Sequence, residues 1–352
     1  MKFAIDVREA CREKRTGKGQ WVYGFVSELL RRGHEVLLFT DSALPSEWEE
    51  HSPRQSVLPS GLRWHRRVAA SLKKGSEYDL YISPTSYIVP FLTGSSVPFV
   101  PVVHDLIAFR HEPHECKATM IERWTLKRTL KFAKHICAVS ESTKSDLLER
   151  FRFLDPQDIT VIFAGPMVAE PLFNQPDHRT ILCAATLCPR KNQFRLIQAY
   201  SRLPQNLREQ YRLLLVGSRG WKNRKILYAA ERTPGVEWGG FVSPEEYNAL
   251  LSTCDILALP SLYEGFGMQV LDALQRGIPV LTSSRGSLPE VTGECAVLVD
   301  PESTDAITEG LQRLLKSRDL QANLRLSGPS QAAHFSWKRT VDYFLAAVKK
   351  LQ

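Results

Sequence analysis

The amino-acid sequence predicts an α/β protein with two doubly wound domains, and three observations lead to this fold class. The chain has 352 residues, enough for two domains of ordinary size with a core each. Short β-branched runs alternate with helical patterns along most of its length, which is typical of a parallel sheet covered by helices on both faces. A proline-containing stretch, residues 165–177, interrupts this alternation. We therefore expect a first domain at 1–165 and a second at 178–335.

In the first half of the chain, β-branched runs predict strands and segments with helical spacing predict helices. Strands are expected at 3–7, 36–40, 80–83, 99–104, 136–140 and 159–163, and helices near 20–31 and 120–133. The stretch 80–103 carries no charge, but it contains four prolines. It is therefore expected to form buried strands and turns and not a membrane span.

The second half repeats the scheme. Strands are expected at 181–186, 213–216, 256–260 and 279–282, and helices near 194–203, 245–252 and 266–276. Near the end of the chain, apolar residues at helical spacing form one stripe from Val341 to Leu351. Such a stripe must pack on an apolar surface, and a return of the helix at 336–352 to the first domain would provide one.

The composition is that of an ordinary folded protein, with 43% hydrophobic and 24% charged residues. The net charge of +8 is spread along the chain, and no nucleic-acid-binding module is recognisable, so nucleic acid is not an expected partner. The N-terminal residues include Lys2 and Asp6 and lack a small-residue cleavage site, unlike a signal peptide. We expect a cytoplasmic protein.

One local patch of positive charge lies between residues 61 and 76. It has no acid, and its cations surround Trp64 and Leu72: Arg63, Arg66, Arg67, Lys73 and Lys74. A solvated helix face accounts for this pattern. The alternative is peripheral contact with an anionic membrane, at the inner face of the plasma membrane, or with an acidic acceptor, because cations beside an interfacial aromatic suit both.

Ligands of open α/β sheets bind beyond the carboxyl ends of the strands, and the segment after strand 256–260 is the most informative there. It reads Ser-Leu-Tyr-Glu-Gly-Phe-Gly-Met-Gln-Val-Leu-Asp over 261–272. Gly265 and Gly267 allow close approach of the backbone to a ligand, and the N-terminus of the following helix offers N–H groups to phosphate or sugar oxygens.

Two acids of this segment, Glu264 and Asp272, are candidate ligand-binding residues. If helical backbone joins them, they are roughly 12 Å apart and cannot share one reacting atom. They can instead hold the two ends of an extended ligand, one at a sugar and one at a ribose. An acid placed for the helix dipole explains either residue alone, but it explains both acids with two glycines poorly.

A second candidate is the pair Arg190 and Lys191, in the strand-to-helix stretch Thr-Leu-Cys-Pro-Arg-Lys-Asn at 186–192. Adjacent cations suit a diphosphate leaving group, because Arg binds oxygens bidentately and Lys supplies a compact charge. A solvated cation pair would be the ordinary interpretation of these two residues alone. The segment at 261–272 in the same domain favours the functional one.

The stretch Thr-Gly-Lys-Gly-Gln at 16–20 resembles a phosphate-binding turn, and Asp41 follows at the end of the next strand. This spacing supports an alternative, an NAD-dependent oxidoreductase. However, about ten residues separate Val7 from Gly17, whereas a dinucleotide fingerprint turns directly out of its strand. A flexible loop before a helix explains the stretch as well as a ligand-contacting loop does.

His104 follows the buried run 97–103 and is a further candidate. A histidine at the carboxyl end of a strand can hydrogen-bond a sugar hydroxyl or stabilise developing charge, and a structural histidine is the alternative. The sequence contains no D-x-D motif, so neither a metal nor another cofactor is expected.

Six motifs of the second domain form a recognisable set: Gly240-Phe-Val-Ser, Leu259-Pro-Ser-Leu-Tyr-Glu-Gly-Phe-Gly, Leu271-Asp-Ala, Gly277-Ile-Pro-Val, Leu288-Pro-Glu-Val and Val299-Asp-Pro. They resemble the retaining glycosyltransferases of family 4. The resemblance is specific over 180–302 and looser over 1–165, where Gly17, Gly19, His104-Asp105 and residues 139–143 match. It implies the GT-B fold, in which two Rossmann-like domains face each other across a cleft and a C-terminal helix crosses back to the first.

The resemblance also implies roles for the candidate residues. Glu264 would contact the transferred sugar, Asp272 the ribose, and Arg190 with Lys191 the diphosphate. The family usually has glutamate where this chain has Asp272. Further implied donor contacts come from the backbone N–H groups of Phe266, Gly267 and Met268, from Val242 in the base pocket, and from Gly19 and His104 of the first domain.

These expectations together describe a hexosyltransferase, with a mannosyltransferase as the first choice. It would move a hexose with retention from GDP-mannose or a UDP-hexose to a glycan, lipid-linked or small-molecule acceptor, without a metal, in cell-surface polysaccharide synthesis. A non-catalytic nucleotide-sugar-binding protein is a further alternative, and the joint presence of Glu264, Arg190 and Lys191 speaks against it.

Overall fold

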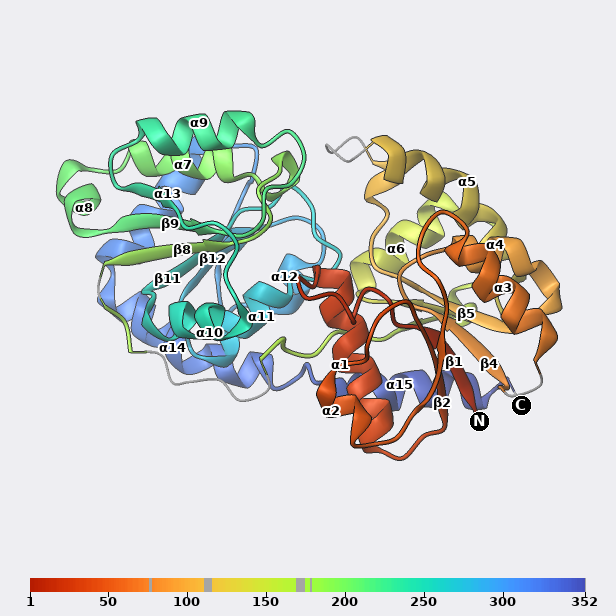
Figure 1. Cartoon of the computed structure of the whole chain (residues 1–352). Coiled ribbons are helices and arrows are strands. Elements are labelled where there is room, and N and C mark those ends of the chain that lie inside the picture. The colour runs from red at the N-terminus through yellow and green to blue at the C-terminus, as the bar shows by residue number, and fades with distance from the viewer. Residues whose placement is uncertain (76–77, 111–115, 169–174, 178, 352) are drawn as a thin grey trace. The chain divides into compact units, whose positions relative to one another are not determined.

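The computed structural model describes residues 1–75, 78–110, 116–168, 175–177 and 179–351. These residues form two compact α/β units (Figure 1). Within the described residues, unit 1 comprises 1–110, 116–167 and 336–351, and unit 2 comprises 168–335. Residues 169–174 of the predicted domain boundary at 165–177 lie outside the described residues.

Unit 1 is built on a parallel seven-stranded sheet with the order β3-β2-β1-β4-β5-β6-β7. The strands are β1 (Phe3–Asp6), β2 (Val36–Thr40), β3 (Arg54–Val57), β4 (Leu80–Ser83), β5 (Phe99–Val103), β6 (Ile136–Ala138) and β7 (Ile159–Val161). The helices are α1 (Gly17–Arg31), α2 (Ser46–Glu49), α3 (Trp64–Lys74), α4 (Ile88–Thr93), α5 (Cys116–Phe132), α6 (Glu141–Arg150) and α15 (Trp337–Lys349). The strand order reverses between β1 and β4, which is where such sheets bind ligands.

Unit 2 has a parallel six-stranded sheet with the order β10-β9-β8-β11-β12-β13. The strands are β8 (Thr180–Ala184), β9 (Arg212–Val216), β10 (Val236–Trp238), β11 (Ile256–Leu259), β12 (Val280–Ser283) and β13 (Val297–Val299). The helices are α7 (Gln193–Ser201), α8 (Gln205–Gln210), α9 (Arg224–Arg232), α10 (Pro244–Thr253), α11 (Met268–Gln275), α12 (Leu288–Thr292), α13 (Thr304–Lys316) and α14 (Arg318–Ala332). Figure 1 shows α7, α9 and α13 on one face of this sheet and α10, α11 and α14 on the other.

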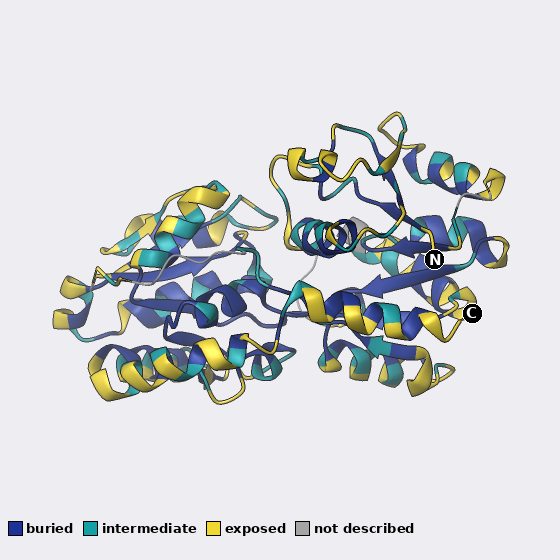
Figure 2. Cartoon of the chain, turned by 90° about the horizontal axis from the view of Figure 1, so that it is seen from below, coloured by how far each residue is buried: buried dark blue, intermediate teal, exposed yellow. Residues whose placement is uncertain are grey.

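The predicted doubly wound architecture is confirmed. Buried strands run through each unit, and the helices around them expose their outer faces (Figure 2). The sequence analysis missed β3, β10 and β13, which are edge strands of the two sheets. An edge strand is covered less completely than a central one, and β3 accordingly has the sequence Arg-Gln-Ser-Val with mostly exposed side chains. The stretch 80–103 forms β4 and β5 as expected, but the short helix α4 lies between them.

No helix in the described part of the chain is long and apolar enough to cross a membrane.

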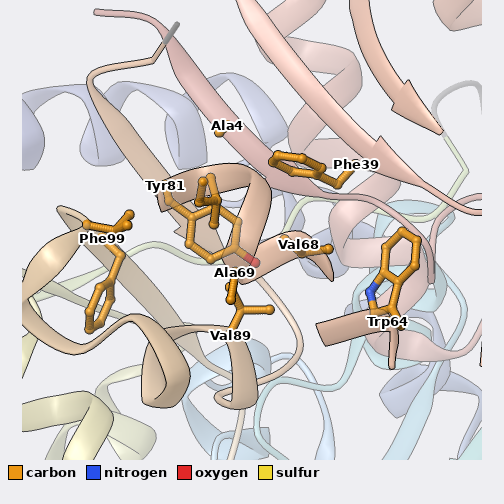
Figure 3. Close-up of a cluster of buried hydrophobic side chains, with 10 residues drawn as sticks. Ala4, Phe39, Trp64, Val68, Ala69, Tyr81, Val89 and Phe99 are labelled. Carbon is orange, nitrogen blue, oxygen red and sulfur yellow. The ribbon is translucent and has the colours of Figure 1, made fainter. Parts of the chain in front are cut away.

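Trp64 belongs to the core of unit 1, so its interpretation as an interfacial aromatic is wrong. The residue has no exposed surface and packs in a cluster with Phe39, Val68 and Tyr81 (Figure 3). Its indole Nε1 donates a hydrogen bond of 3.0 Å to Oδ2 of Asp6, which lies in β1. The amphipathic helix α3 therefore buries its apolar stripe, and its cations form the solvated face that was the simpler interpretation.

The C-terminal helix α15 crosses back to unit 1, as predicted. Trp337 at its start donates from Nε1 to the carbonyl oxygen of Pro166, at 2.9 Å. Phe344 packs edge-on against Phe3 of β1 and Phe25 of α1, with ring centroids 5.5 and 5.2 Å apart. The apolar stripe near the end of the chain is thus part of the first unit's core.

Candidate active site

The main candidate site lies where the strand order of unit 2 reverses. β8 and β11 are hydrogen-bonded neighbours, and both run in the same direction, so the loops that follow them meet at one edge of the sheet. Arg190 and Lys191 follow β8 in a 3₁₀ turn, Pro189–Lys191. Glu264 is in the loop after β11. Residues more than seventy positions apart are thereby brought together.

Glu264, Arg190 and Lys191 form one buried ion cluster. Lys191 Nζ lies 2.6 Å from Oε1 of Glu264, and an Arg190 guanidinium nitrogen lies 2.9 Å from Oε2. The same Arg190 nitrogen donates to the carbonyl oxygen of Tyr263, at 2.9 Å. Burial raises the pKa of Glu264, but the charges of Lys191 and Arg190 outweigh it and bring the pKa to about 2. The carboxylate is therefore ionised at neutral pH, and the cluster keeps one positive charge in excess.

Two side chains without a predicted role support this cluster. Asn192 adopts the left-handed conformation, with φ of 62°, and its Nδ2 donates to the carbonyl oxygens of Pro260 and Pro301 at 2.9 and 2.7 Å. Ser287 Oγ donates to the carbonyl oxygens of Glu264 and Phe266, at 3.0 and 2.8 Å. The sequence could have indicated the left-handed conformation of Asn192, because asparagine tolerates this conformation and this residue stands just before a predicted helix. Nothing in the local sequence pointed to Ser287.

The segment between Glu264 and Asp272 is only partly helical, which corrects the sequence estimate of their separation. α11 begins at Met268, and Gly267 before it has a φ of 103°. A Cβ atom at Gly267 would lie 2.7 Å from Cδ2 of Leu288, so both the conformation and the space favour glycine there. The distance of roughly 12 Å assumed a continuous helix.

Asp272 lies inside unit 2 and belongs to a different hydrogen-bonded group from Glu264. Its side chain has no exposed surface, and its Oδ2 accepts a hydrogen bond of 3.1 Å from the hydroxyl of Tyr247 on α10. Burial, followed by the charge of Asp272, raises the pKa of Tyr247 well above its ordinary value, so the phenol keeps its proton. Val242, expected near a base pocket, is half-buried just before α10.

In unit 1, His104 and Gly19 both make close structural contacts. His104 Nε2 donates to the carbonyl oxygen of Pro84 at 2.6 Å, which leaves Nδ1 as the acceptor of the ring. Burial, with a contribution from Lys18, lowers the pKa of His104 to about 4, so the ring is neutral at neutral pH. A Cβ atom on Gly19 would lie 2.5 Å from the carbonyl oxygen of Glu9, so packing by itself already requires glycine there.

Among the residues that the structure describes, no group of three or more His, Cys, Asp or Glu side chains is arranged to hold a metal ion.

Comparisons with known proteins identify the family. The model of Glycosyltransferase Family 4 matches residues 16–165, and that of Glycosyl transferases group 1 matches residues 169–331. O-antigen chain mannosyltransferase B of Escherichia coli is 30% identical over 301 residues, which are 81% of this chain and 78% of that protein. The chain belongs to glycosyltransferase family 4. An MMP alpha-(1->4)-mannosyltransferase of Mycolicibacterium hassiacum is 29% identical over 72% of this chain and 65% of its own length.

The fold of this glycosyltransferase is GT-B, as predicted. The Anabaena protein HepE, solved in complex with UDP-glucose, superposes with a TM-score of 0.77 at 18% identity, covering 100% of this chain and 99% of that one. The family membership confirms that the protein is an enzyme that transfers a glycosyl group. An NAD-dependent oxidoreductase and a non-catalytic binding protein are not favoured.

Proposed function

We propose that this glycosyltransferase moves mannose from GDP-mannose to a hydroxyl group of a glycan or lipid-linked glycan, with retention and without a metal, in the synthesis of a cell-surface polysaccharide. Mannose as the transferred sugar is supported by the two similar mannosyltransferases of Escherichia coli and Mycolicibacterium hassiacum. A UDP-hexose is the second choice of donor, because HepE was solved with UDP-glucose.

The observation that carries this proposal is the buried cluster of Glu264, Arg190 and Lys191. Two cations share one carboxylate, so the cluster has a surplus positive charge at the edge of the sheet where α/β proteins bind ligands. A diphosphate that leaves with its negative charge is stabilised by such preorganised cations. A metal ion is then not required for the same task.

In this proposal each candidate residue has one task. Arg190 and Lys191 neutralise the leaving diphosphate, and Glu264 binds hydroxyl groups of the transferred sugar. The acceptor oxygen bonds to the anomeric carbon on the face from which the diphosphate leaves, while the bond between that carbon and the diphosphate breaks. The hydroxyl proton passes to the departing diphosphate oxygen, and no side chain acts as a nucleophile. The rate then comes from positioning and from neutralisation of charge.

The other contacts of the donor follow the same assignment. Asp272 binds the ribose. For this contact, the Tyr247 hydroxyl must either share the carboxylate of Asp272 with the ribose or release it. Backbone N–H groups of Phe266, Gly267 and Met268 bind donor oxygens, and Val242 borders the base. From unit 1, Gly19 allows the backbone to approach the donor, and His104 accepts a hydrogen bond from a sugar hydroxyl through Nδ1.

A thermal-shift panel of nucleotide sugars tests the proposal, because a ligand that binds the folded state raises the melting temperature. We expect GDP-mannose to give the largest shift, and incubation with a mannoside acceptor to yield an α-linked product by NMR. A larger shift with a UDP-hexose than with GDP-mannose would make the UDP-hexose the donor. A shift with NAD and with no nucleotide sugar would overturn the proposed activity.

A further inference from the structure

The outer face of α5 exposes large apolar side chains to solvent. Met120, Ile121 and Trp124 are exposed over 69%, 46% and 67% of their surface. The opposite side of this helix is in the core of unit 1, where Leu126 and Leu130 are buried. Most of the surface of Met120 and Trp124 is therefore not used for the packing of the helix. A group of such side chains on one surface indicates an interaction site.

Cations surround these apolar residues on the same helix. Arg123, Lys127, Arg128 and Lys131 are all exposed. The one acid within α5 is Glu122, whose carboxyl oxygen Oε1 is inaccessible to solvent. Burial raises the pKa of Glu122 to about 7. The outer face of α5 is therefore positively charged without a compensating acid on the helix.

The aromatic and cationic side chains of this region are in contact. Trp124 packs on Phe91 of α4, with ring centroids 4.3 Å apart. The Arg128 guanidinium lies over Phe91 and over Phe132, 5.3 and 5.5 Å from the ring centroids. Lys131 Nζ lies 5.6 Å from the ring centroid of Phe153. Tryptophan is enriched at surfaces with one wet and one apolar side, and the cation–aromatic contacts hold positive charge beside the exposed rings.

A cavity of about 630 Å³ continues this surface between α5 and the end of α6. It is lined by cations and phenylalanines and by no acid: Arg123, Lys127, Arg150, Arg152, Phe109, Phe151 and Phe153. The positive charge thus extends beyond the helix itself.

α3 provides the contrast within the same unit. It exposes Arg66, Lys73 and Lys74, but the large apolar side chains within the helix are buried in the core. The exposed Leu62 and Val57 precede the helix and are not part of its outer face. A cationic helix without an apolar outer face is attracted to anionic surfaces but has nothing to insert.

We propose that the outer face of α5, defined as Met120, Ile121, Trp124, Lys127, Arg128 and Lys131, docks on an anionic lipid bilayer. The cations pair with lipid headgroups, Trp124 lies at the interface, and the aliphatic side chains enter the boundary of the acyl chains. A second copy of this chain fits poorly, because a two-fold contact would place these cations opposite one another. A soluble acidic partner would meet the charges but not the apolar side chains.

Co-sedimentation of the full chain with vesicles tests this assignment. Because the experiment requires no turnover, its result does not depend on whether the proposed activity is correct. We compare phosphatidylcholine vesicles with vesicles that also contain phosphatidylglycerol, at a salt concentration of about 0.15 M. The α5 charge variant is Lys127→Gln with Lys131→Gln. Its matched control, with the same loss of charge, is Arg66→Gln with Lys74→Gln on α3. Trp124→Ala tests the apolar part.

We expect binding to anionic vesicles that falls roughly tenfold or more in the α5 charge variant, since each cation near such a surface contributes about a fivefold change in affinity. The α3 control should change binding less than the α5 variant does, and Trp124→Ala should weaken it several-fold. All substituted residues are at the surface, so the melting temperatures should stay close to that of the parent. Equal losses in the α5 variant and the α3 control would mean unspecific attraction and overturn the assignment.

Two further results would also overturn it. In the first, Trp124→Ala leaves binding to anionic vesicles unchanged, and the soluble polyanion heparin binds the protein as tightly as the vesicles do. If the α5 charge variant also loses heparin binding, the surface would instead bind a soluble acidic partner. The second is the absence of binding to both kinds of vesicle.

Discussion

Lys191 Nζ lies 2.6 Å from Oε1 of Glu264, and both side chains are about nine-tenths buried. The two residues follow neighbouring parallel strands, β8 and β11. A buried charge without its partner is costly, so the two groups depend on each other for stability as well as for binding. Changes at Glu264 therefore have to be analysed by kinetics and by stability together.

Glu264→Gln should lower kcat on the order of a hundredfold or more, because a contact that strengthens as charge develops in the transition state is lost. The KM for the donor should change much less. Steady-state kinetics measures both, and circular dichroism checks that the variant is folded. Glu294→Gln, at an exposed acid of the same unit, is the matched control and should keep its activity. Full activity of Glu264→Gln would remove the residue from the site.

The same cluster predicts a loss of stability in acid. The pKa of Glu264 is lowered from 4.5 to about 2, so its charge contributes stability that is present above pH 4.5 and is lost as the pH falls towards 2. Urea denaturation between these pH values should therefore show a steeper decrease for the parent than for Glu264→Gln. Parallel pH profiles of the two proteins would contradict the assigned ion cluster.

Asp272→Asn should mainly raise the donor KM, by roughly tenfold, because a contact kept equally in the ground state and the transition state contributes uniform binding. Calorimetric titration with the free nucleoside diphosphate should show the same weakening. Tyr247→Phe removes the hydroxyl that donates to Asp272 but leaves the carboxylate, so it serves as the control for indirect effects. Unchanged nucleotide binding in Asp272→Asn would leave this acid without a ribose role.

Activity should survive EDTA, because Arg190 and Lys191 supply the positive charge that a metal would otherwise bring to the diphosphate. The assay compares turnover with and without the chelator after exhaustive dialysis. Complete loss of turnover that magnesium or manganese restores would contradict this prediction.

Glu122 should make unit 1 less stable at alkaline pH. Burial raises its pKa from 4.5 to about 7, with Lys18 opposing and Asp105 adding to the shift. The folded state favours the protonated acid, so protonated Glu122 is compatible with the fold and the ionised form destabilises it. The free energy of unfolding of unit 1 is therefore unaffected by Glu122 below pH 4.5 and falls as the pH rises through 7. Glu122→Gln, which mimics the protonated form, should gain on the order of 2 kcal/mol over the parent between pH 4.5 and 8. Thermal melts at both pH values measure the difference, and a constant difference would contradict the shifted pKa.

The central strands of both sheets and most of the candidate site could be predicted from the sequence, because these features are local. β-branched runs and helical spacing are patterns of residues close together in the sequence. The motif from Ser261 to Asp272 likewise has a recognisable order of acids and glycines. The edge strands β3, β10 and β13 were missed. β3 and β10 contain polar residues, as strands at the margin of a sheet can. β13 is apolar, but with three residues it is too short to show a periodic pattern.

What only the tertiary structure decided is which distant groups meet and which way a helix faces. Lys191 and Glu264 are 73 positions apart, and their contact depends on β8 and β11 being neighbours, which the order of elements along the chain does not reveal. Trp64 and Trp124 both stand among cations in the sequence. The first is buried against Asp6 and the second lies in solvent, because the direction of a helix face is set by what packs against it.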